Sequence, residues 1–165
     1  MPQVFTLSVV GLALAALSGA THPIASHGVQ MLAPAGWHQV RSAPDAPVTD
    51  PRTVLVVGTG AVHTRWSQCQ LTRYDVPSGG AVVVAVRWSS VRAAGGGKLR
   101  RGRWPLQSLR TVRPHTMECF PGRAAAADLL LGAHPYQVNV MVGARATTSV
   151  VRAALAVARS FDLTH

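Results

Sequence analysis

The stretch YQVNVMVGARATTSVVRAALAVARSF, residues 136–161, decides the fold class of this chain. Residues 136–142 alternate, which predicts a strand with one face in the core. The inward residues are Tyr136, Val138, Val140 and Val142, while Gln137, Asn139 and Met141 point outward or toward a second layer. After Gly143, Thr147 or Thr148 can cap an amphipathic helix that runs to about residue 161.

Working outward, other short segments carry the β-branched or alternating residues that are typical of strands. They are residues 29–32, 37–41, 53–57, 68–74, 81–88 and 116–120. Residues 81–88 are apolar on both faces, which predicts a central strand. Residues 123–131 fit either a helix or a strand, and residues 41–52 are expected to form an irregular loop. Several strands and a terminal helix predict an α+β sandwich with an antiparallel sheet.

The N-terminus carries an uncharged apolar run, residues 4–17, followed by Ser18, Gly19 and Ala20. Crossing a hydrocarbon core of ~30 Å takes roughly twenty residues, so this run indicates a signal peptide cleaved after about Ala20 rather than a permanent anchor. Ala20 has no thiol to receive a lipid. The alternative is an apolar helix in a cytosolic core. The predicted organisation is a signal peptide at 1–20, a polar segment at 21–28 and a single α+β domain at 29–163.

Two cysteines, Cys69 and Cys119, are an even number in a chain that is expected to be exported. A disulfide between them would close a fifty-residue loop and contribute about 4 kcal/mol in the chain-entropy account. Two separately buried thiols are the alternative. Neither cysteine has further ligands at metal-binding spacing, so no metal site is predicted.

Charge is the second strong feature, because sixteen Lys and Arg residues stand against six acids, for a net charge of +10. Residues 95–105 join glycines to cations, which predicts a flexible, solvated, positive loop with its base closed by the disulfide. The predicted contact surface is Lys98, Arg100, Arg101, Arg103 and Trp104. It suits an anionic envelope polymer, lipid headgroups or an envelope protein. Nucleic acid is not expected, because the patch has one aromatic residue and no recognition module. The alternative is that these side chains are simply solvated.

Catalytic patterns are weak. Residues 54–63 place Gly58 and Gly60 after a strand as in a dinucleotide fingerprint, but His63 replaces the third glycine and the following segment is too short for a crossover helix. The glycines are better explained by a turn or bulge. The histidines are scattered and no two acids have catalytic spacing, so neither an enzyme nor a cofactor is predicted.

The turn Ala33-Pro34-Ala35-Gly36-Trp37, the closing strand and helix, and Ser160-Phe161 carry a resemblance. Over residues 29–163 the chain resembles the PsbP-like α/β sandwich and, more loosely, exported actinobacterial domains of unknown function. The resemblance implies a non-enzymatic binding or assembly factor, and no functional residue is carried over from it.

These features together predict a secreted, non-catalytic binding or interaction module at the cell envelope. A first alternative is an exported small-ligand domain with a pocket lined by Trp37, Trp66 or Trp88. A second is an exported hydrolase, which requires a solvent-facing histidine near a serine or an acid.

Overall fold

The structure is a computed structural model that describes residues 20–43, 50–69, 73–95 and 99–164. Its strands are β1 (Thr21–Ser26), β2 (Val29–Pro34), β3 (Trp37–Gln39), β4 (Arg52–Thr59), β5 (His63–Thr64), β6 (Tyr74–Asp75), β7 (Ala81–Arg87), β8 (Arg100–Arg101), β9 (Arg113–Pro114), β10 (Arg123–Leu131), β11 (His134–Val142) and β12 (Asp162–Leu163). The helices are α1 (Trp104–Gln107) and α2 (Thr148–Arg159).

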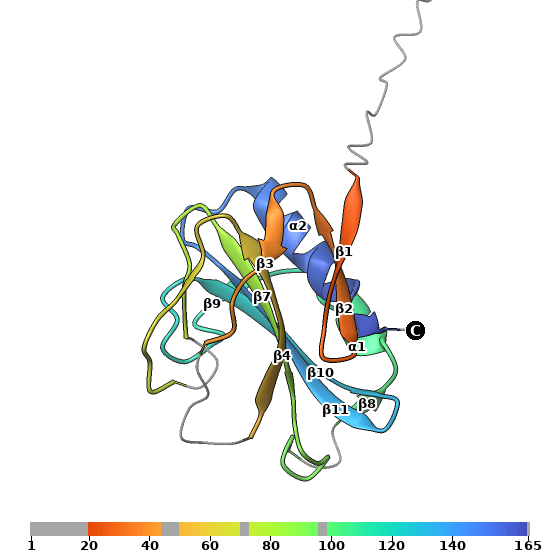
Figure 1. Cartoon of the computed structure of the whole chain (residues 1–165). Coiled ribbons are helices and arrows are strands. Elements are labelled where there is room, and N and C mark those ends of the chain that lie inside the picture. Colours follow the sequence, from red (N-terminus) through yellow and green to blue (C-terminus); the bar gives the residue numbers. More distant parts are fainter. Residues whose placement is uncertain (1–19, 44–49, 70–72, 96–98, 165) are drawn as a thin grey trace, which may run out of the picture.

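The main sheet has the order β3-β4-β7-β11-β10-β8, with β9 also paired to β10. Its pairs are antiparallel except for the short β8, which runs parallel to β10. A smaller sheet, β1-β2-β12, lies with α2 on one side of the main sheet (Figure 1). The chain therefore has the predicted α+β class, with a mostly antiparallel sheet and a C-terminal helix.

The two faces of the main sheet belong to two separate apolar cores. Alternation in β7 and β11 divides them: Val83 and Val140 face α2 and the small sheet, while Val84 and Met141 face the opposite way. On that second side, Tyr74 of β6 and the loop residue Phe120 complete the core. The predicted second layer under β11 is thus confirmed, and Asn139 is fully buried.

Helix α2 forms where the sequence predicts it. Thr147 is its N-cap, and the Thr147 hydroxyl accepts a hydrogen bond from the Val150 N–H. Its buried stripe comprises Ala154, Leu155, Val157 and Ala158. At its C-terminal end, the Ser160 hydroxyl accepts a 2.8 Å hydrogen bond from the Leu32 N–H, which ties the helix to β2.

The polar segment 21–28 contains a strand in the structure. Most of it is β1, which pairs antiparallel with β2 from Thr21 opposite Pro34 to Ser26 opposite Val29. Its side chains are mainly exposed and Ile24 alone in β1 is buried, so no apolar alternation marks it in the sequence. The fold therefore includes this segment, whereas the predicted signal peptide falls on residues 1–19, outside the described residues, and on Ala20.

Two predicted strands are wrong. In the segment 68–74, Tyr74 is the described residue that belongs to a strand, β6, and residues 70–72 lie outside the described part. Residues 116–120 form a turn, because His115 and Cys119 have φ of 55° and 62°, which a strand cannot accommodate. The ambiguous segment 123–131 is a strand, β10.

The glycine pair after β4 has a packing explanation. β4 runs antiparallel to β7, whereas a dinucleotide fold requires a parallel crossover. A Cβ on Gly58 would lie 3.0 Å from the Val40 Cγ2 and 3.2 Å from the Ala81 carbonyl oxygen. After it, the Val62 N–H bonds the Thr59 carbonyl to close a turn.

Candidate functional site

Arginines gather at one end of the main sheet, where β4 begins and β7 ends. The strand register aligns Arg52, Arg87, Tyr136, Leu129 and Arg100 in one row across β4, β7, β11, β10 and β8. Neighbouring strands are about 4.8 Å apart, so Arg52 and Arg100 are separated by roughly 19 Å along this row. We call this end, with Arg52, Arg87, Arg100 and Arg101, the basic end of the sheet; it lies at the lower side of Figure 1.

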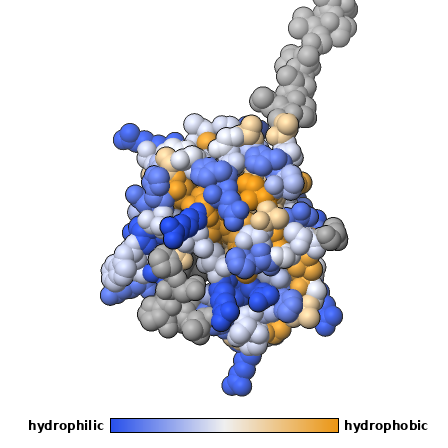
Figure 2. Space-filling model, in the orientation of Figure 1, coloured by the Kyte–Doolittle hydropathy of each residue, from blue (hydrophilic) through white to orange (hydrophobic). Residues whose placement is uncertain are grey.

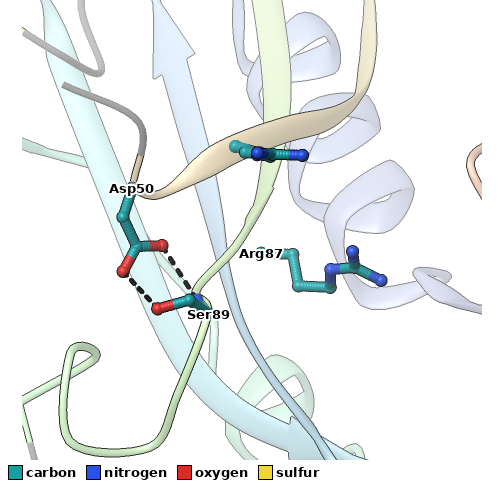
Figure 3. Close-up of a pocket in the computed structure, with 4 residues that line it drawn as sticks. Asp50, Arg87 and Ser89 are labelled. Atoms are coloured by element: carbon teal, nitrogen blue, oxygen red, sulfur yellow. Dashed lines mark hydrogen bonds between the residues drawn. The ribbon is translucent and has the colours of Figure 1, made fainter. Parts of the chain in front are cut away.

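A pocket of about 250 Å³ opens at the basic end, lined by Asp50, Arg52, Arg87 and Ser89 (Figure 3). Arg52 and Arg87 are directly opposed across β4 and β7, and both side chains are exposed. Directly opposed like charges on paired strands are unfavourable by roughly 0.2–1 kcal/mol. The fold therefore places two cations together at a position where each would be more stable alone.

The Asp50 carboxylate in this pocket is bonded to Ser89. One carboxylate oxygen accepts from the Ser89 N–H at 2.8 Å, and the other accepts from the Ser89 hydroxyl at 2.7 Å. Figure 3 shows the Arg87 side chain extending away from this pair. The carboxylate thus joins the start of β4 to the end of β7, while Arg87 faces another part of the pocket.

Tyr136 lies opposite Arg87 across the paired strands β11 and β7. The phenol is 3% exposed, and its ring packs edge-on against Phe161 with the ring centroids 5.3 Å apart. Burial raises the pKa of Tyr136, while the neighbouring Arg87 acts in the opposite direction. Arg87 therefore rests against a fixed, neutral phenol, which limits the freedom of its guanidinium.

The predicted contact residues divide into three groups. Arg100 and Arg101 form β8 and are exposed, and Trp104, at the start of α1, is 64% exposed. Lys98 lies outside the described residues. Figure 2 shows strongly hydrophilic residues at the lower side of the molecule and on its other sides, around a more apolar centre.

Arg103 forms the third group, because its guanidinium binds other residues of the same chain. One guanidinium nitrogen is 3.0 Å from an Asp162 carboxylate oxygen, and another donates to the Arg159 carbonyl at 2.7 Å. Arg159 in turn donates to the Leu109 carbonyl at 2.9 Å. Arg103 is therefore a structural link between the start of α1 and the end of α2, and the prediction that it belongs to a contact surface finds no support in its geometry.

The expected flexible loop is ordered over its described second half. β8 pairs with β10, and the Gly102 N–H donates to the Leu130 carbonyl at 2.8 Å. Glycine and arginine have no preference for strands, so the conformation of β8 is explained by its pairing with the edge of β10. The basic side chains accordingly project from a fixed backbone.

The Cys69–Cys119 disulfide is present, as predicted, but it does not close the base of the basic segment. Cys119 precedes Arg123, the first residue of β10, whereas β8 pairs at Leu129 and Leu130. Six residues of strand span about 20 Å, so the disulfide lies toward the other end of β10. It staples the loops that cover the second core, and its presence is consistent with an extracytoplasmic location.

The three tryptophans of the small-ligand alternative lie in different environments in the described part of the chain. Trp37 is buried in the first core, Trp66 is 78% exposed and Trp88 is half-buried. Neither described pocket is lined by any of them.

A second, smaller pocket of about 60 Å³ includes the pair that a hydrolase would need, Ser26 and His27. The His27 Nδ1 lies 2.7 Å from the Ser26 Oγ and 3.1 Å from the Val54 carbonyl oxygen. A carbonyl can only accept, so the contact with Val54 is a hydrogen bond in the tautomer that carries the proton on Nδ1, and in that tautomer Nδ1 has no lone pair with which to activate the hydroxyl. We therefore assign the pair a structural role in the turn between β1 and β2.

Within the described residues, no three His, Cys, Asp or Glu side chains group as metal ligands. In that same part of the chain, neither helix has the length and apolar character that a membrane crossing requires. The chain matches no family model, no curated protein and no solved structure.

Sequence reasoning missed Arg52, Arg87, Asp50 and Ser89. A signal was present, since Arg52 immediately precedes one predicted strand and Arg87 nearly ends another. Pairing those two strands antiparallel brings the arginines together, but the sequence does not reveal which strands are neighbours.

Proposed function

We propose that this chain is an exported, non-catalytic binding module of the cell envelope that holds an anionic polymer at the basic end of its sheet. The observation that carries the proposal is that exposed arginines of β4, β7 and β8 lie at one end of the sheet, on a backbone that the sheet fixes. Anionic lipid headgroups are the alternative surface.

Energetics favour a repeating ligand. Each cation close to an anionic surface contributes about 1 kcal/mol, so the four arginines of the basic end supply about 4 kcal/mol, which corresponds to a Kd of about 1 mM. A single small anion would therefore bind weakly. A polymer that engages several sites at once gains from the high effective concentration of its remaining charges.

The row also favours a linear partner over a flat one. Arg52 and Arg87 line a recessed pocket, whereas Arg100 and Arg101 project from the edge strand β8. A polymer that spans the roughly 19 Å between the pocket and β8 can meet both pairs of arginines. A bilayer surface reaches the projecting residues more readily than the pocket. The disulfide, the expected signal peptide and the PsbP-like resemblance, which implies a binding or assembly factor, support the same function.

The test is binding of the chain from residue 21 onward to long-chain polyphosphate, measured by isothermal titration at 50 and 500 mM salt. Binding should weaken at least tenfold at high salt and in Arg100→Glu/Arg101→Glu. The matched control is Arg145→Glu/Arg152→Glu, which makes the same charge change at exposed positions beyond the other end of β11 and on α2.

Equal loss in both double variants would show that net charge alone matters and would refute the proposed surface. Binding that is indifferent to salt would favour the small-ligand alternative.

A further inference from the structure

We propose that the Arg52–Arg87 pocket is a binding site for a single phosphate group. The inference rests on the proposed function, which it deepens by naming the chemical group and the residues that hold it. Neither arginine belongs to the contact surface predicted from the sequence.

The first step is that Arg52 and Arg87 are opposed across β4 and β7 and that neither belongs to the ion pair described above, although the Asp50 carboxylate lines the same pocket. Among the described residues, the ion pair within 4.0 Å joins Arg103 to Asp162, at another part of the fold. The Asp50 carboxylate at the pocket wall has hydrogen bonds from Ser89 to both of its oxygens. An anion between Arg52 and Arg87 would convert a repulsive pair into two attractive contacts.

The second step concerns the shape of that anion. A guanidinium offers two parallel N–H donors, which match two oxygens of a carboxylate or of a phosphate. A carboxylate has only two oxygens and is satisfied by one arginine. Two arginines on adjacent strands can each use a different pair of oxygens on a tetrahedral phosphate, so the geometry favours phosphate over carboxylate.

The third step is preorganisation and size. Arg87 rests against the buried phenol of Tyr136, so part of the entropy of ordering its side chain has already been lost. The pocket volume of about 250 Å³ lies below the roughly 300–1,000 Å³ of sites that enclose a drug-sized ligand. It therefore suits one charged group of a larger molecule, with the rest of that molecule outside.

The experiment is a titration of the isotope-labelled chain from residue 21 onward with inorganic phosphate at pH 7, followed by backbone amide NMR. The Arg52, Arg87 and Ser89 amide signals should shift and saturate in the millimolar range, and equal concentrations of acetate should leave them nearly unchanged. Arg52→Gln/Arg87→Gln should weaken phosphate binding at least tenfold. The control Arg145→Gln/Arg152→Gln should bind as the unmodified chain does.

Phosphate should also raise the melting temperature of the unmodified chain and of the control, but not that of Arg52→Gln/Arg87→Gln. Equal responses to acetate and phosphate, or an unchanged response in the double variant, would overturn the inference. Polyphosphate and phosphatidylglycerol vesicles then distinguish the source of the group: the variant should lose affinity for the soluble chain more than for the vesicles.

The two proposals fail separately. Salt-dependent polyphosphate binding that needs Arg100 and Arg101 but is indifferent to Arg52 and Arg87 would preserve the proposed function and remove the phosphate site. Phosphate shifts at Ser89 without polymer binding would do the reverse.

Discussion

Replacing Arg103 with alanine tests whether this residue holds the fold together or serves a ligand. Its ion pair with Asp162 joins side chains that are 40% and 29% exposed, so it is worth about 0.5–1 kcal/mol. The hydrogen bond to the Arg159 carbonyl has a charged donor at the end of a helix and adds about 1 kcal/mol after discounting for partial exposure. Arg103→Ala should therefore lower the free energy of unfolding by about 2 kcal/mol.

For a domain of this size, that loss corresponds to a fall in melting temperature of about 6 °C. The assay is urea unfolding followed by circular dichroism, with Arg101→Ala as the matched control, because Arg101 is exposed in β8. The control should change the free energy of unfolding by less than about 0.5 kcal/mol. Hydrogen exchange at the Gly102 amide, bonded to the Leu130 carbonyl, should accelerate in Arg103→Ala as well.

A loss below about 0.5 kcal/mol in Arg103→Ala, equal to that of the control, would refute the structural assignment. Weakened polyphosphate binding without any loss of stability would return Arg103 to the contact surface.

Three further predictions follow from contacts described above. Arg52→Gln should raise the free energy of unfolding by roughly 0.2–1 kcal/mol by relieving its opposition to Arg87, and a decrease measured in urea would contradict this. Burial raises the pKa of Tyr74 and Tyr136 above that of the unfolded chain, so their contribution to stability is present below pH ~10 and is lost as pH rises through the folded values. Alkaline unfolding curves of Tyr136→Phe should show a smaller loss above pH ~10 than those of the unmodified chain. Replacing both cysteines with serine should cost up to about 4 kcal/mol yet leave phosphate binding intact at temperatures where the variant is folded, because the disulfide lies toward the other end of β10.

The sequence predicts best where burial imposes a period on the side chains. β7 is apolar on both faces, which correctly predicts a central strand, and the alternation in β11 correctly predicts the face that enters the first core. The sequence also predicts an N-cap and an apolar stripe for helix α2, and the structure confirms both.

The sequence does not predict strands that are defined by backbone pairing with a neighbouring strand. β1 buries only Ile24 and β8 buries neither of its arginines, so backbone pairing with β2 and β10 defines them instead of any apolar period. The Arg52–Arg87 pocket is a stronger example of a feature that the sequence does not predict, because it forms only where β4 and β7 are neighbours. No local pattern around Arg52 or Arg87 carries that information.

The position of β11 in the sheet has a consequence for how the chain acquires its structure. β11 lies between β7 and β10, and among the described residues it is followed by α2 and β12, which complete the first core and the small sheet. A nascent chain that ends before residue 134 lacks the strand that joins the two halves of the sheet. The main sheet can therefore be completed only after residues 134–142 have been synthesised, well after β4 and β7 have left the ribosome.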